Sequence, residues 1–157
     1  MYTGSLHLHS LLRWVMVALM IFLLLRSFMG RKDGRAFTAQ DRKLVLFLMI
    51  SAHLQLVIGL YQYFVGNWGV KQFENLSMGE VMKNATSRFF AVEHLTGMLI
   101  AIILITIANS TSKKAMDDNS KWNRLFWLYT ISFLLILACV PWPIREVGAG
   151  RSWFPGM

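Results

Sequence analysis

Four apolar segments, each close to the length that crosses a lipid bilayer, constrain this chain more than any other feature. They cover residues 8–28, 44–65, 89–108 and 125–140. A helix needs about 20 apolar residues to cross the hydrocarbon, and there every backbone polar group must be paired within the segment or with its neighbours. We therefore predict an all-α integral membrane protein, with residues 1–157 forming a single domain built as an antiparallel bundle of four transmembrane helices.

The composition agrees with this fold class. The chain is 55% hydrophobic and only 15% charged, with a mean hydropathy of +0.47, whereas a soluble domain carries about 25% charged residues. A single cysteine, Cys139, excludes an intramolecular disulfide and a cysteine-rich metal site. The first apolar segment lacks a basic leader and is interrupted by Arg13, so we expect it to be retained rather than cleaved as a signal peptide.

Basic residues set the expected orientation. The formal net charge is +8, and most of the 16 Lys and Arg residues follow the first and third apolar segments. Connections rich in Lys and Arg stay on the cytoplasmic side, so both termini are expected outside. This placement explains the charge without nucleic acid as a partner. The residues on the expected cytoplasmic side are Arg26, Arg31, Lys32, Arg35, Arg42, Lys43, Lys113, Lys114, Lys121 and Arg124.

The connections carry local signals for helix starts. Thr38 can cap the helix that carries the second span. In the long connection 66–88, Ser77 stands three residues before Glu80, the spacing of a capping box. This pattern is compatible with a short helix at the membrane surface, and an irregular connection is the alternative.

Polar residues also occur on the second span and in the segment after the fourth span. Gln55 and Gln62 form a stripe with Ser51 and Gly59 on the second span, which indicates hydrogen bonds between helices rather than a quinone site.

The C-terminal segment after the fourth span is too polar to cross the membrane. Its Trp-Phe pair, residues 153–154, is expected to dock back at the outer surface, beside His7 and His9 at the mouth of the bundle.

Polar residues at membrane depth are costly, so each is treated as a functional hypothesis. With a rise of about 1.5 Å per helical residue, Arg13 lies about 7 Å and Glu93 about 8 Å below the outer ends of their spans. We therefore expect an Arg13–Glu93 ion pair that ties the first span to the third. The residues in this class are His7, His9, Arg13, His53, Glu93 and His94.

Imidazoles on different spans point to a b-type haem, whose iron takes axial histidine ligands in many proteins. His94 and His53 are the first choice of axial pair, and His9 is the substitute for His53. His7, at the outer interface, is a further alternate ligand. The sequence shows no hydrolase, transferase or nucleotide-binding motif and no catalytic residue, so a redox carrier or subunit is favoured over a stand-alone enzyme.

A haem also needs room beside its flat ring and partners for its carboxylates. Gly97 follows His94 by one turn and Gly59 follows His53, so both glycines are candidate cofactor-binding positions. Arg13 and Arg88 lie near the outer surface and can pair with propionates, because the planar guanidinium donates two parallel hydrogen bonds to a carboxylate.

Two alternatives of other classes stay open. In one, His7, His9, Glu93 and His94 form an outer-mouth cluster that binds Cu or Zn in a metal-binding or transport protein. In the other, the chain is a non-catalytic membrane subunit or assembly factor, and its polar residues only tie helices together.

Three runs carry a resemblance to known proteins: His7-Leu8-His9-Ser10-Leu11-Leu12-Arg13-Trp14, Asp41-Arg42-Lys43 leading into Ser51-Ala52-His53-Leu54-Gln55-Leu56-Val57-Ile58-Gly59-Leu60-Tyr61, and Arg88-Phe89-Phe90-Ala91-Val92-Glu93-His94. They resemble a family of small four-helix bacterial membrane proteins described as "cytochrome b"-like, which implies b-haem binding in the bundle. A looser similarity is to the four-helix halves of haem A synthase, where a motif with Glu and His at a span's outer end supplies a haem ligand. Glu93-His94 looks like a contracted form of that motif.

The resemblance implies haem b and says little about the reaction or the partners. With the intramembrane histidines, the expected role is electron transfer in a bacterial inner membrane, with a quinone and a redox protein as candidate partners. A homodimer or a larger respiratory complex is compatible with the same sequence.

Overall fold

The structure is a computed structural model that describes residues 2–148 and 153–154. Its long helices are α1 (Tyr2–Asp33), α2 (Ala39–Val65), α6 (His94–Ser112) and α7 (Asp118–Cys139). Four helical stretches are long and apolar enough to cross a membrane, the third of them running through residues 85–112. The predicted all-α bundle of four spans is therefore confirmed, and its helices extend past the apolar segments into flanking polar residues.

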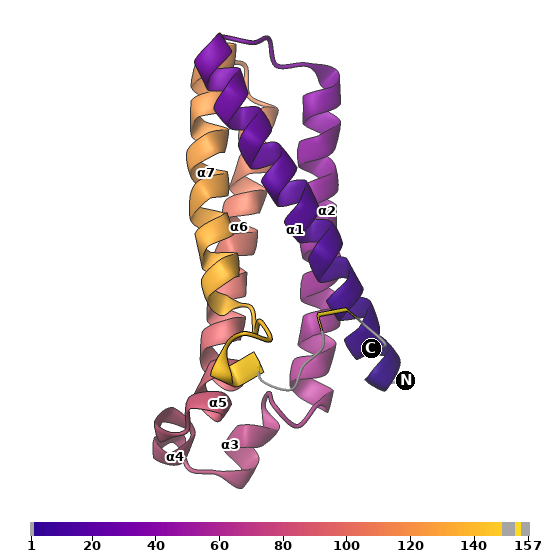
Figure 1. Ribbon diagram of the computed structural model, residues 1–157, viewed down its shortest axis with the longest axis vertical. Helices are drawn as coiled ribbons and strands as arrows, with labels where there is room; N and C mark the ends of the chain where they lie inside the picture. The colour runs from indigo at the N-terminus through magenta and orange to yellow at the C-terminus, as the bar shows by residue number, and fades with distance from the viewer. Residues whose placement is uncertain (1, 149–152, 155–157) are drawn as a thin grey trace.

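Successive spans run in opposite directions, so the bundle has two chemically different ends (Figure 1). The first, here called the terminal end, holds both ends of the described chain and the short helices α3 (Lys71–Asn75), α4 (Met78–Lys83) and α5 (Ala85–Arg88). The second, here called the basic end, holds the two short connections α1–α2 and α6–α7, where most basic residues gather.

The predicted helix starts are confirmed at two positions. The Thr38 hydroxyl accepts a hydrogen bond from the Asp41 amide at 3.3 Å, and the Asp41 carboxylate accepts one from the Thr38 amide at 2.8 Å. Ser77 and Glu80 form the same reciprocal box at the start of α4. The long connection between the second and third spans thus contains short helices, because its caps satisfy the first free amides of a helix.

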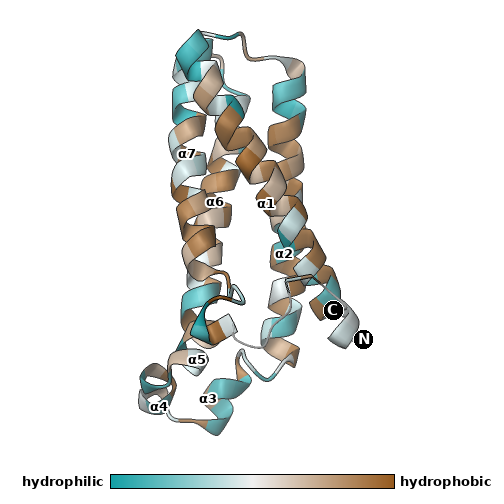
Figure 2. Ribbon diagram, viewed as in Figure 1, coloured by the Kyte–Doolittle hydropathy of each residue, from teal (hydrophilic) through white to brown (hydrophobic). Residues whose placement is uncertain are grey.

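Side chains in the middle of the bundle that face away from the core are apolar. Val57, Ile103 and Leu134 are each 57–65% exposed, and the hydrophobic middle of the bundle contrasts with polar ends (Figure 2). An exposed apolar belt between polar ends suits a lipid bilayer and not water. The fold is that of a multi-pass membrane protein.

Packing at the basic end is tight. The Trp122 ring of α7 lies against Gly30 of α1, where a Cβ would stand 2.7 Å from Trp122 Cγ. The Trp122 indole N–H donates to the Arg35 carbonyl at 2.8 Å, and Arg26 pairs with the buried carboxylate of Asp41. These contacts hold α1, α2 and α7 together at this end.

Helix α1 crosses the bundle diagonally, from beside α7 at the basic end to beside α2 at the terminal end (Figure 1). There, Gln55 donates to the His9 carbonyl at 2.8 Å and Gln62 donates to the Ser5 carbonyl at 2.7 Å. The prediction that these glutamines bond between helices is confirmed. Because α1 leaves α7 in this half, space opens between the α1–α2 pair and the α6–α7 pair.

Candidate cofactor site

A cavity of about 440 Å³ fills the space between the two helix pairs, a volume in the range of small-molecule and cofactor sites. The walls that lie toward the middle of the bundle, its deeper walls, are apolar. The walls toward the terminal end carry nearly all of the polar side chains of the cavity. The apolar residues include Met16, Leu56, Leu60, Leu95, Met98, Ile102, Ile105 and Ile136, and the polar residues include His7, His9, Ser10, Arg13, Gln55, Gln62, Tyr63 and His94.

A π-turn, Phe89–Glu93, leads directly into α6 and positions its first residue, His94. The His94 amide donates to the Phe89 carbonyl, five residues back, so this turn holds one residue more than an α-helical turn. The Tyr63 hydroxyl of α2 donates to the Ala91 carbonyl inside the turn at 3.1 Å. Neither Tyr63 nor the turn is among the site features predicted from the sequence.

The His94 ring is fixed by a hydrogen bond to the end of α7. Its Nδ1 lies 2.6 Å from the Cys139 carbonyl oxygen. A carbonyl can only accept, so Nδ1 carries the proton and Nε2 carries the ring's lone pair when the imidazole is neutral. This is the arrangement in which metal-ligating histidines are held, with the second nitrogen bonded to a carbonyl or carboxylate.

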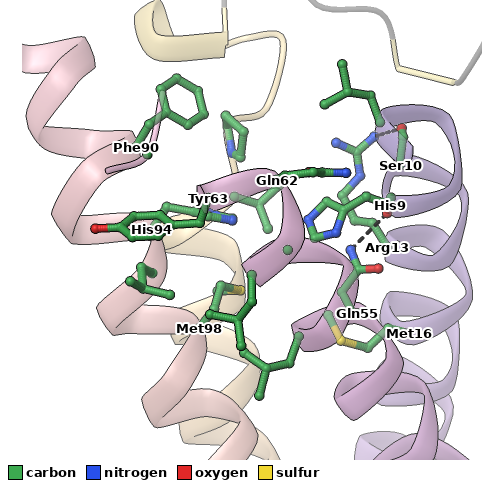
Figure 3. A pocket seen from close by; sticks show the side chains of 18 of the residues that line it. His9, Ser10, Arg13, Met16, Gln55, Gln62, Tyr63, Phe90, His94 and Met98 are labelled. Atoms are coloured by element: carbon green, nitrogen blue, oxygen red, sulfur yellow. Dashed lines mark hydrogen bonds between the residues drawn. The ribbon is translucent and has the colours of Figure 1, made fainter. Parts of the chain in front are cut away.

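His9 lies on the opposite wall of the cavity, on α1 (Figure 3). Its ring packs on Gly59 of α2, where a Cβ would stand 3.2 Å from His9 Cε1. The buried Nδ1 atom of His9 has no hydrogen-bond partner among the described residues. Figure 3 shows His9 and His94 on different helices with the methionine-lined part of the cavity, at Met16 and Met98, below them.

Arg13 stands at the mouth of the cavity beneath the C-terminal aromatic residues. It donates to the Trp153 carbonyl at 2.9 Å, and the Trp14 indole donates to the same oxygen at 2.8 Å. Its guanidinium carbon lies 5.4 Å from the Trp14 ring and 5.6 Å from the Trp142 ring, and Phe154 stacks on Trp14. The expected docking of the Trp-Phe pair beside the mouth is therefore confirmed.

The expected Arg13–Glu93 ion pair is not formed. Glu93 is exposed and accepts a hydrogen bond from Arg88 Nε at 2.6 Å, whereas Arg13 turns toward the C-terminal segment. The two residues were matched by depth, but depth does not fix the direction in which a side chain leaves its helix. Arg88 also donates to the Met82 carbonyl and does not line the cavity, so the structure does not bring it to this site.

His53, the first-choice partner of His94, does not line the cavity. It is exposed on α2, and its Nδ1 bonds to the Met49 carbonyl of its own helix at 2.9 Å. Gln55 does line the cavity, and two residues correspond to a rotation of about 200° around a helix. His53 therefore faces the opposite way, and the structure places His9 rather than His53 in the same cavity as His94.

The two candidate glycines have different surroundings. Gly59 lines the cavity and leaves room for the His9 ring. Gly97 is buried against α7, where a Cβ would stand 3.0 Å from Cys139 Cβ and closer still to its sulfur. Gly97 therefore permits close approach of α6 and α7, and it does not face the cavity.

Within residues 2–148 and 153–154, no group of three or more His, Cys, Asp or Glu side chains is arranged to hold a metal ion. His7, His9 and His94 line the cavity, but Glu93 points to Arg88 instead. Comparisons of the chain with protein-family models, with curated proteins and with solved structures found no match.

Proposed function

We propose that the chain is a membrane-embedded b-type haem protein that carries electrons, and that His94 and His9 are the residues that would hold the haem. The observation that carries this proposal is the pair of histidines on different helices of one cavity, with Nδ1 of His94 committed to the Cys139 carbonyl. In this pairing His9 replaces His53, the partner favoured by sequence alone.

The residues present fit such a group on three counts. The buried Nδ1 of His9 lacks a hydrogen-bond partner among the described residues, which is costly unless a bound group satisfies it. The deeper walls are apolar, as a macrocycle requires. Arg13 at the mouth supplies a planar guanidinium that suits carboxylates.

A haem held by two histidines supplies a one-electron carrier. His94 and His9 would hold this group, and the Cys139 carbonyl orients the His94 ring. The apolar walls disfavour water, and Arg13 lines the cavity beside the rings of Trp14 and Trp142. If the basic end lies in the cytoplasm, as the distribution of charge favours, the site lies in the outer half of a bacterial inner membrane.

A visible spectrum of protein purified from haem-supplemented cells tests the proposal. We expect a Soret band with sharp α and β bands after reduction, and one haem per chain by pyridine haemochrome assay. The variant His94→Gln keeps an N–H donor for the Cys139 carbonyl but removes the imidazole, so it separates ligand loss from helix disruption. We expect His94→Gln and His9→Ala to lose the six-coordinate spectrum.

The matched control is His53→Ala, which removes an intramembrane histidine that does not line the cavity. It is expected to keep the full spectrum. A colourless wild-type protein would refute haem binding and favour the non-catalytic subunit or assembly factor. Loss of the spectrum in His53→Ala with its retention in His9→Ala would refute the ligand pair.

A further inference from the structure

The end of α7 is held mainly by side chains from outside the helix. An α-helix leaves its last four carbonyls without partners inside the helix, and in a membrane such groups cost several kcal/mol when unpaired. The Ile136 carbonyl accepts from the amide of the C-cap residue Val140, and the carbonyls of Leu137, Ala138, Cys139 and Val140 each accept a hydrogen bond from outside the helix. The donors are Trp142 Nε1 to Leu137 (2.9 Å), Arg145 Nη1 to Ala138, His94 Nδ1 to Cys139 (2.6 Å), and Trp142 N with Arg145 Nη1 to Val140 (2.9 and 3.4 Å).

The sequence explains why side chains are needed here. Pro141 and Pro143 stand four residues after Leu137 and Cys139, the spacing at which a helix would supply the next N–H donors. Proline has no N–H. The Cys139 carbonyl therefore lacks its backbone donor, and His94 Nδ1 takes that place.

Arg145 contacts both neighbours of this bond. Its guanidinium donates to the Ala138 and Val140 carbonyls, which flank Cys139. It also lies 5.1 Å from the centre of the Phe89 ring, and that ring lies 6.1 Å from the His94 ring. One side chain thus fixes the peptide units on either side of the His94 acceptor.

We propose that Arg145 is a positioning residue for His94: by binding the Ala138 and Val140 carbonyls, it holds the Cys139 carbonyl where His94 Nδ1 must donate. This inference rests on the proposed function. A proton held on Nδ1 leaves the lone pair on Nε2, which is then the nitrogen of His94 that would bind the haem iron. The first test of the inference needs no cofactor.

The test measures the tautomer of His94 by ¹⁵N NMR in cofactor-free, histidine-labelled protein at a pH where the imidazole is neutral. The His94→Gln variant assigns the signals. In the wild type we expect the Nδ1–H form to dominate. In Arg145→Ala its share is expected to fall at least about twofold, because the acceptor carbonyl is no longer held in place.

Two further variants make the result specific. Arg145→Lys keeps the charge and an N–H donor and is expected to restore most of the Nδ1–H form. Arg124→Ala removes an exposed guanidinium from the other end of α7 and is expected to leave the tautomer unchanged. Circular dichroism of each variant verifies that the helices have formed.

In haem-loaded protein, loss of such an outer contact is expected to weaken cofactor affinity by about tenfold or more. A wild-type tautomer in a folded Arg145→Ala variant overturns the inference, whether or not haem binds. A wild-type protein that binds no haem overturns the proposed function while leaving the tautomer result interpretable. The two failures are therefore distinguishable.

Discussion

Replacement of Gly97 by alanine tests the contact on which the His94 site depends. The new Cβ would stand 3.0 Å from Cys139 Cβ and closer to the Cys139 sulfur, inside the 3.4–4 Å of ordinary contact. Because the cysteine sits on the last turn of α7, relief requires this turn to move away from α6. Overpacking of this kind costs about 1–3 kcal/mol, and here it also lengthens the His94–Cys139 hydrogen bond.

The assay is the free energy of unfolding in mixed micelles, followed by circular dichroism for Gly97→Ala, Cys139→Gly and the double variant. Cys139→Gly removes both atoms that the new methyl group meets, so the cycle is expected to show a favourable coupling of about 1–3 kcal/mol. Gly4→Ala, where nothing lies within 4 Å, is the control without a clash. Wild-type stability in Gly97→Ala, or the same loss in the Cys139→Gly background, would refute the packing argument.

Three further outcomes follow from the structure. Gly59→Leu is expected to displace the His9 ring and lower the haem-to-protein ratio. Gly59→Ala is expected to lose less haem, since its Cβ would meet only the ring edge at 3.2 Å. Equal haem content in the wild type and both variants would contradict this. Asp41→Ala is expected to lower the free energy of unfolding by about 1.5–3 kcal/mol, because hydrogen bonds to Arg26 and Thr38 are lost together; the mixed-micelle assay checks it. Hydrogen bonds from the Ser77 hydroxyl and amide hold the pKa of the Glu80 carboxyl below its ordinary value. The cap therefore stabilises the start of α4 fully at a pH above the ordinary pKa of a glutamate, and this stabilisation is lost as the pH falls through the lowered pKa of Glu80. An NMR titration is expected to show this pKa rising in Ser77→Ala, and an unchanged value would contradict the role of the cap.

The sequence predicts the spans and their caps because both depend on local properties. Helix length follows from the run of apolar residues, and the Thr38 and Ser77 caps need only neighbours three residues away. The direction of α1 is different. It depends on contacts between distant residues, such as Gly30 with Trp122, and no local pattern encodes them.

The candidate site was predicted only in part, for a reason particular to membranes. In a soluble helix the apolar face marks the interior, but a membrane helix is apolar both toward lipid and toward its neighbours. The surroundings of His53 and His94 therefore look alike in sequence, although His53 is exposed and His94 lines the cavity. Depth placed Arg13 and Glu93 together, but rotation about each helix separates them.

The π-turn has a consequence for how the chain tolerates changes in length. Such a turn contains one residue more than the helix around it, so removal of one residue from Phe89–Glu93 can restore a regular helix. Both flanking parts would then keep their orientation, because the turn already accommodates the extra residue. A deletion in the regular part of α6 would instead rotate one flank by about 100°, so the π-turn is the place in this span where one residue can be lost while His94 stays against the end of α7.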